Sequence, residues 1–145
     1  MADVQRFLML DKIAELLTGG TGASEVELMP SGEPEKFSAL HIFDEGQDPE
    51  PGEVGTERFA LSIGIDGYVS GGAGREALEA LNNLYADTKE ALFAEPVLGG
   101  LANEIEETSF RVHVTERASK RRLSFSLGLS VHYATQRGSP RTIQS

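Results

Sequence analysis

The segment from Ser70 to Glu95 constrains the fold of this 145-residue chain most, because its pattern is that of one long amphipathic helix. Its apolar stripe recurs at steps of three and four residues and comprises Ala77, Leu78, Leu81, Leu84, Tyr85, Thr88, Ala91 and Leu92. Pro96 follows the segment, and the residue before a proline avoids helical backbone angles. Segments with the two-residue period of β-strands flank it on both sides. The sequence therefore predicts a sheet with this helix packed on it.

A second, shorter helix is predicted from Asp3 to Leu17. Asp3 is expected to cap its free amides, and Gly19 and Gly20 to end it. Its predicted apolar stripe is Phe7, Leu10, Ala14 and Leu17. Both helices would bury one face on the sheet.

Five segments have the alternation of strands, namely Ser24–Met29, Phe37–Phe43, Arg58–Val69, Glu104–Glu116 and Arg121–Ala134. The last two form a predicted hairpin with three facing apolar pairs, Phe110–Leu127, Val112–Phe125 and Val114–Leu123. A slip of one residue would break both faces of this hairpin, so the pattern specifies the register. The predicted fold class is α+β, with two helices on a mixed, mainly antiparallel sheet of about five strands and a long C-terminal β-hairpin.

The acidic segment Asp44–Glu57 is predicted to be a mobile loop within a single domain of residues 1–145. It has one isolated valine and two prolines, and its acids are Asp44, Glu45, Asp48, Glu50, Glu53 and Glu57. Such a composition buries too little apolar surface to offset the entropy of ordering. It is either a solvated hairpin loop or a segment that a partner orders. Residues 135–145 are predicted to be a flexible arm, either frayed or ordered on a neighbour.

Composition excludes several classes of function. No run of 18 apolar residues is present, so we expect no membrane span, and the N-terminal pattern is not that of a secretory signal. The chain has no cysteine, which excludes disulfides, thiolate metal sites and a cysteine nucleophile. The net charge of −10 argues against a simple nucleic-acid-binding protein.

The charge is divided unequally along the chain. Residues 1–110 contain 6 Lys and Arg against 22 Asp and Glu, a net charge of −16, whereas residues 111–145 contain 7 Lys and Arg and only Glu116, a net charge of +6. A basic cluster marks the tip of the predicted hairpin, at Arg117, Lys120, Arg121 and Arg122. The cluster fits contact with an acidic protein surface, contact with nucleic acid, or a solvated turn.

No residues form a recognisable catalytic or cofactor site. His41, His113 and His132 lack the close spacing of zinc ligands, and ordinary surface histidines are the preferred interpretation. The glycines at 71, 72 and 74 follow a strand and precede a helix, but the lysine and Ser/Thr of a phosphate-binding loop are missing. We therefore predict no catalytic residues, no cofactor and no metal, with a small nucleotide-binding enzyme or a monomeric adaptor domain as the alternatives.

The order of elements resembles that of the tail terminator proteins of long-tailed bacteriophages and related gene-transfer particles, also called tail-to-head joining or minor tail proteins. The resemblance lies chiefly in the segment EPVLGGL at 95–101 and in the ending VHYATQRGSPR at 131–141. Head–tail connectors and tail tube subunits are similar virion parts and remain alternatives.

The resemblance implies a structural virion protein that forms a homohexameric ring at the head-proximal end of the tail. Such a ring would cap the tail tube protein, end its polymerisation and join it to a neck protein. Genomic DNA would pass through without specific binding, and assembly would take place in the host cytoplasm without a membrane. The residues expected at a subunit or partner interface are Arg58, Arg111, His113, Arg117, Lys120, Arg121, Arg122, His132, Arg137 and Arg141.

Overall fold

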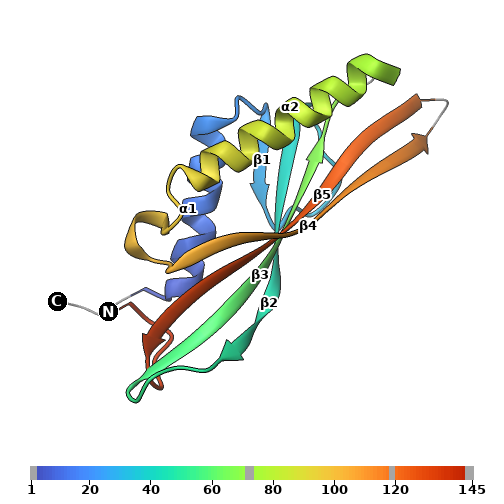
Figure 1. Cartoon of the computed structure of the whole chain (residues 1–145). Coiled ribbons are helices and arrows are strands. Elements are labelled where there is room, and N and C mark those ends of the chain that lie inside the picture. The colour runs from blue at the N-terminus through green and yellow to red at the C-terminus, as the bar shows by residue number, and fades with distance from the viewer. Residues whose placement is uncertain (1–2, 71–73, 118–119, 143–145) are drawn as a thin grey trace.

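The computed structural model describes residues 3–70, 74–117 and 120–142. It consists of two helices and a five-stranded sheet, in the strand order β1-β2-β3-β5-β4 (Figure 1). The elements are α1 (Gln5–Gly20), β1 (Glu25–Leu28), β2 (Ala39–Glu50), β3 (Thr56–Tyr68), α2 (Gly74–Phe93), a 3-10 turn (Leu98–Gly100), β4 (Glu104–Arg117) and β5 (Lys120–Gln136). β1 pairs with β2 in parallel and every other pairing is antiparallel. The predicted α+β class, with its long C-terminal hairpin, is confirmed.

A single core lies between the two helices and one face of the sheet. Alternate residues of the central strands point into it, among them Leu61, Ile63 and Ile65 of β3. Phe125 of β5 is fully buried opposite Gly67, where any added Cβ atom would overlap its ring. A glycine is therefore required at position 67 for the aromatic ring to lie flat in the core.

The long helix begins and ends close to its predicted bounds. Its buried residues are Ala77, Leu81, Leu84, Thr88 and Leu92, which belong to the predicted stripe, whereas Leu78 is half exposed. Tyr85 packs on Phe110 with ring centroids 4.2 Å apart, and its hydroxyl donates to Glu107 at 2.7 Å. These contacts fix α2 against the base of the β4–β5 hairpin.

The first helix differs from its prediction at both ends. Val4, not Asp3, is the N-cap residue, and no side chain caps the helix. The helix continues through both glycines and ends at Gly20, with Thr21 as the C-cap residue, whose amide donates to the Leu17 carbonyl. Its buried residues are Met9, Leu10, Ile13 and Leu17. The predicted place of Phe7 in the core is wrong, because Phe7 is 57% exposed.

The prediction of a long acidic loop is also wrong. β2 continues through Asp44 to Glu50 and β3 starts at Thr56, so the connection consists of residues 51–55 alone. A bulge between Asp44 and Gln47 shifts the register of β2 against β3. Contacts with residues distant in sequence hold this acidic part of β2 in place. The composition of the segment gives no sign of these contacts.

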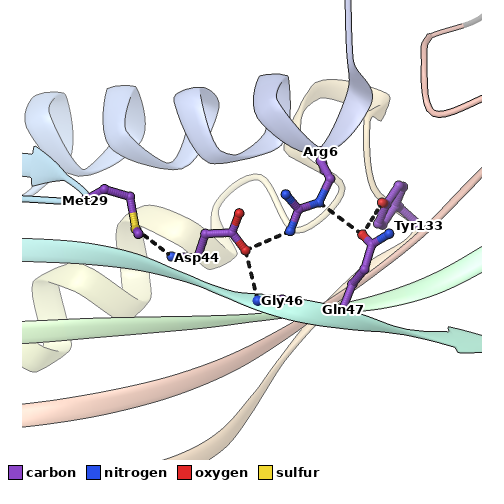
Figure 2. Close-up of polar contacts among 6 residues, drawn as sticks. All are labelled: Arg6, Met29, Asp44, Gly46, Gln47 and Tyr133. Carbon is purple, nitrogen blue, oxygen red and sulfur yellow. Dashed lines mark hydrogen bonds and ion pairs between the residues drawn. The ribbon is translucent and has the colours of Figure 1, made fainter.

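Arg6 of α1 makes the first of these contacts (Figure 2). Its guanidinium donates to Asp44 at 2.7 Å and to the Gln47 side chain at 3.2 Å. The Tyr133 hydroxyl donates to the same Gln47 oxygen, and the Gly46 amide donates to Asp44 at 3.0 Å. Side chains from α1 and β5 thus hold the bulge of β2 in place.

The C-terminal segment is docked on the N-terminus rather than extended as an arm. β5 ends at Gln136, and an antiparallel bridge joins Val4 to Arg141. The Gln5 amide donates to the Pro140 carbonyl at 2.9 Å, and the Thr142 amide donates to the Asp3 carbonyl at the same distance. The predicted flexible arm is therefore wrong for residues 135–142, and its last three residues lie outside the described part of the chain.

Candidate assembly surfaces

The face of the sheet opposite the helices, here called the open face, has no helix over it among the described residues. Small and polar side chains occupy its centre, on positions that alternate with the buried core residues: Ala60, Ser62, Gly64, Ser124, Ser126, Gly128, Ser130 and Ala134. Gly64 lies directly opposite Gly128 across β3 and β5. The Glu45 side chain lies over Gly64, where an added Cβ atom would stand 3.1 Å from its carboxylate. The open face is therefore polar in its centre and partly covered by acids.

A shallow hollow of about 400 Å³ lies on this face. Glu45 and Asp66 contribute carboxylates to it, Ser109 and Ser126 contribute hydroxyls, and Phe43 forms one apolar side. Two carboxylates repel a phosphate or another anion, so this hollow does not suit a nucleotide.

His132 forms a bridge across the open face. Its Nδ1 atom lies 2.7 Å from Glu50 of β2, and its Nε2 atom lies 2.5 Å from Glu106 of β4. The hydrogen bond to Glu50 contributes most to raising the pKa of His132, with Glu106 adding to the effect and partial burial opposing it. A protonated imidazole donates to both acids, so His132 links strands on opposite sides of β3 and β5.

Asp66, Ser126 and His113 form a row on the open face, but their order differs from that of a catalytic triad. The Ser126 hydroxyl donates to Asp66 at 2.9 Å, and His113 Nε2 lies 3.0 Å from the same hydroxyl oxygen. In a hydrolase triad the acid orients the histidine, which then takes the serine proton. Here the acid contacts the serine directly, and nothing in the row orients His113 as a base. The row therefore gives no support to a hydrolase activity.

The β4–β5 hairpin projects at the end of the molecule where α2 begins (Figure 1), and part of its apolar face is exposed. Its predicted register is confirmed, with Phe110 opposite Leu127, Val112 opposite Phe125 and Val114 opposite Leu123. Val112 is 46% exposed and Val114 is 58% exposed, because the pattern of alternation continues beyond the core. This end of the hairpin presents a small apolar strip to its surroundings.

Two arginines of the hairpin lie on its other face, since Arg111 pairs with Ser126 and Arg122 pairs with Thr115. The guanidinium of Arg122 lies over the Phe37 ring at 4.3 Å, and Arg111 is exposed on β4. The backbone pairs Arg117 with Lys120 and Glu116 with Arg121, which confirms the predicted position of the turn; the side chains of these four residues lie outside the described part.

The ten predicted interface residues do not form one patch. Arg111, His113, Arg117, Lys120, Arg121 and Arg122 belong to the hairpin. Arg58, which pairs with Ala134, and Arg137, whose amide donates to the Gly55 carbonyl, lie at the other end of β5 together with His132. Arg141 lies beside the N-terminus. Of the predicted loop acids, Asp44 turns to α1, Glu45, Asp48 and Glu50 lie on β2, and Glu53 is exposed in the turn.

His41 is not a surface histidine, and this part of the sequence prediction is wrong. It is 2% exposed, and its Nε2 atom lies 2.6 Å from Glu25 of β1. That contact contributes most to lowering the pKa of Glu25, which also accepts from the Glu35 amide at 3.1 Å. Glu27 completes a group whose possible ligand atoms lie within 4.8 Å of one another. Sequence spacing missed this group because its members come from two strands.

No family model matches the chain, and no curated protein matches it in sequence. Within the described residues, no helix is long and apolar enough to cross a membrane. The geometry of the chain itself therefore carries the functional argument.

Proposed function

We propose that the protein is a structural subunit of a virus tail, which assembles into a homohexameric ring that caps the tail tube. In this role the ring ends polymerisation of the tube protein and joins the tail to the neck of the head, with DNA passing through its centre. The proposal takes up the resemblance to tail terminator proteins. A head–tail connector or a tail tube subunit is the alternative within the same class.

One observation carries most of this proposal: the molecule presents surfaces of opposite charge in different places. The hairpin end contains Arg111, Arg117, Lys120, Arg121 and Arg122 against Glu116. The outer surface of α2 is acidic, with Glu76, Glu79, Asp87 and Glu90 exposed. Rings are closed by contacts between two different patches of each subunit, and such patches attract one another when their charges are opposite.

The open face supports passage of DNA without binding. Its acids include Glu45, Asp48, Asp66 and Glu106, which repel phosphates when they line a channel. These features favour a structural role over an enzyme, for which the hollow and the Asp66–Ser126–His113 row supply no activated nucleophile.

The direct test is assembly with the tail tube protein of the same virus. Added to growing tubes, the protein should bind at one end of each tube and stop growth there, as seen by electron microscopy of tube length and ends. A tail tube subunit would instead lengthen the tubes, and a protein unrelated to tails would bind neither the ends nor the walls.

A further inference from the structure

The sheet has two free edges. Within the described residues, the strand order β1-β2-β3-β5-β4 gives β1 and β4 a partner strand on one side only. Alternate residues of an edge strand direct their backbone N–H and C=O groups away from the sheet, so such an edge can pair with a further strand. Figure 1 shows β1 and the β4–β5 hairpin on opposite sides of the sheet and near the same end of it.

The register of the sheet places one part of β4 level with β1. A row of residues that face one another crosses all five strands and consists of Glu27, His41, Asp66, Ser126 and Arg111. The next two rows run from Val26 to Val112 and from Glu25 to His113. Residues 25–27 and residues 111–113 are therefore at the same height on the two edges.

The side chains along these two stretches are complementary on both faces of the sheet. On the open face, β1 carries Glu25 and Glu27, whereas β4 carries Arg111 and His113, which are both exposed. Glu25 is held by His41, but Glu27 is exposed and none of the described residues donates to its carboxylate.

On the other face, both edges are apolar. Val26 of β1 packs against the core and is only partly buried, and Val112 of β4 is 46% exposed. A strand that paired with either edge would cover these side chains. Each edge thus offers an apolar side chain on the helix side of the sheet and a charged one on the open face, with opposite charges on the two edges.

The two edges of one molecule cannot meet, because β2, β3 and β5 lie between them and separate them by about 19 Å, four strand spacings. We propose that β4 of one copy pairs with β1 of a second copy and so continues the sheet from subunit to subunit. Three pairs of residues then face one another: Arg111 with Glu27, Val112 with Val26, and His113 with Glu25.

The directions of the strands suit a ring. β1 is parallel to β2 and the other three pairings are antiparallel, so β4 runs opposite to β1. Rotation about an axis along the strands places β1 of the next copy beside β4, antiparallel and at the same height. A copy that has used β4 still offers β1, so the contact repeats until a ring closes.

This inference rests on the proposed ring and names the contact between its subunits. The same rotation keeps every open face on one side of the ring wall, as passage of DNA past the open face requires. Ion pairs between Arg111 and Glu27 guide the approach, and the strand pairing and the buried valines hold the contact.

Reversal of one charge at a time tests the contact. Glu27→Arg and Arg111→Glu each place like charges opposite one another, so each should raise the concentration at half-assembly by at least about tenfold in light scattering. Both changes are at exposed side chains, and the variants should stay folded by circular dichroism. Glu53→Arg, the same change of charge in the turn between β2 and β3, is the control and should assemble like the unchanged chain. Unaltered assembly of Glu27→Arg or Arg111→Glu would overturn the inference.

Mixing the two charge variants gives a sharper result. When copies alternate, the introduced arginine faces the introduced glutamate at one contact, and the native Glu27 faces the native Arg111 at the next. An equimolar mixture should therefore assemble at the concentration of the unchanged chain, into rings that native mass spectrometry shows to hold equal numbers of both variants. A mixture that assembles no better than its components would overturn the direct pairing of these residues.

A disulfide can trap the contact, because the natural chain has no cysteine. Glu27→Cys combined with Arg111→Cys should give, on oxidation, covalent multimers up to the size of the ring, since the two positions of one copy are too far apart to join. Glu53→Cys with Arg111→Cys is the control and should give no such series. A ring in which positions 27 and 111 never join contradicts this contact alone, whereas an unchanged chain that is monomeric at every concentration contradicts the proposed function as well.

Discussion

Arg6 donates a hydrogen bond of 2.7 Å to Asp44 and so joins the first turn of α1 to the middle of β2 (Figure 2). Partial burial alone would raise the pKa of Asp44. The hydrogen bonds from Arg6 and the Gly46 amide, together with the charge of Arg6, outweigh burial and lower that pKa below its ordinary value. This pair orders an acidic segment that has little apolar surface of its own.

Asp44→Asn should lower the free energy of unfolding by about 1–2 kcal/mol at neutral pH, because it weakens a charge-assisted hydrogen bond at a partly exposed site. The lowered pKa means that this contribution is present above the ordinary carboxyl pKa and is lost as the pH falls through the folded-state value. Urea unfolding from pH 7 to pH 3 should therefore show that the difference in unfolding free energy between the unchanged chain and Asp44→Asn shrinks as the pH falls. Asp48→Asn, an exposed change on the same strand, is the control and should alter stability little. A constant difference down to pH 3 would contradict the assignment.

The contribution of His132 to the stability of the sheet should have the opposite pH dependence to that of Asp44. Its pKa is raised chiefly by Glu50, so its contribution is complete below the ordinary histidine pKa and disappears as the pH rises through the folded-state value. The difference in unfolding free energy between the unchanged chain and His132→Gln should be greatest in mild acid and shrink towards alkaline pH. His113→Gln removes an exposed imidazole from the same face and should show a smaller difference. A difference for His132→Gln that grows with pH would show that the bridge to Glu50 and Glu106 is absent in solution.

Reversal of Arg121 and Arg122 to glutamate should weaken assembly while the subunit stays folded. Loss of Arg122 from the Phe37 ring should lower the unfolding free energy by only about 0.5–1 kcal/mol. The matched control reverses the exposed residues Lys36 and Arg75, which changes the net charge equally. If reversal of Arg121 and Arg122 instead abolishes a salt-dependent affinity for duplex DNA and leaves assembly unchanged, the basic tip is a DNA-binding surface.

The His41–Glu25 pair should hold β1 on β2 without a metal ion. Chelation with EDTA should leave the thermal midpoint unchanged, because the Glu25 oxygens already accept from His41 and the Glu35 amide. His41→Gln should lower the unfolding free energy by about 1–3 kcal/mol with or without EDTA, because it disturbs a buried hydrogen bond. Stoichiometric metal that is retained by the unchanged chain and lost from His41→Gln would contradict this.

The hairpin could be predicted from sequence because its information is local. The pairs from Phe110–Leu127 to Val114–Leu123 follow from alternation alone, since a one-residue slip would reverse both faces. Periodicity shows which side chains share a face, but it does not show how much of that face is covered: Val112 and Val114 are 46% and 58% exposed on the edge strand β4.

The acidic strand could not be predicted because its partners are distant in sequence. Composition indicates a loop for Asp44–Glu57, yet Arg6 lies 38 residues from Asp44 and His132 lies 82 residues from Glu50. The docking of residues 140–142 on the N-terminus could not be predicted for the same reason, because its partners Asp3, Val4 and Gln5 are at the other end of the sequence. Phe7 is an error of the opposite kind. Its spacing in the sequence fits the apolar stripe of α1, but its side chain is exposed.

The mass of the purified chain in solution tests the central claim most directly. Native mass spectrometry across a range of concentrations at low salt should show a closed oligomer of the 15.6 kDa subunit, a hexamer in the proposed ring, that weakens as salt rises. A strict monomer at high concentration and low salt, together with no ring of this protein in assembled tails, would contradict the account.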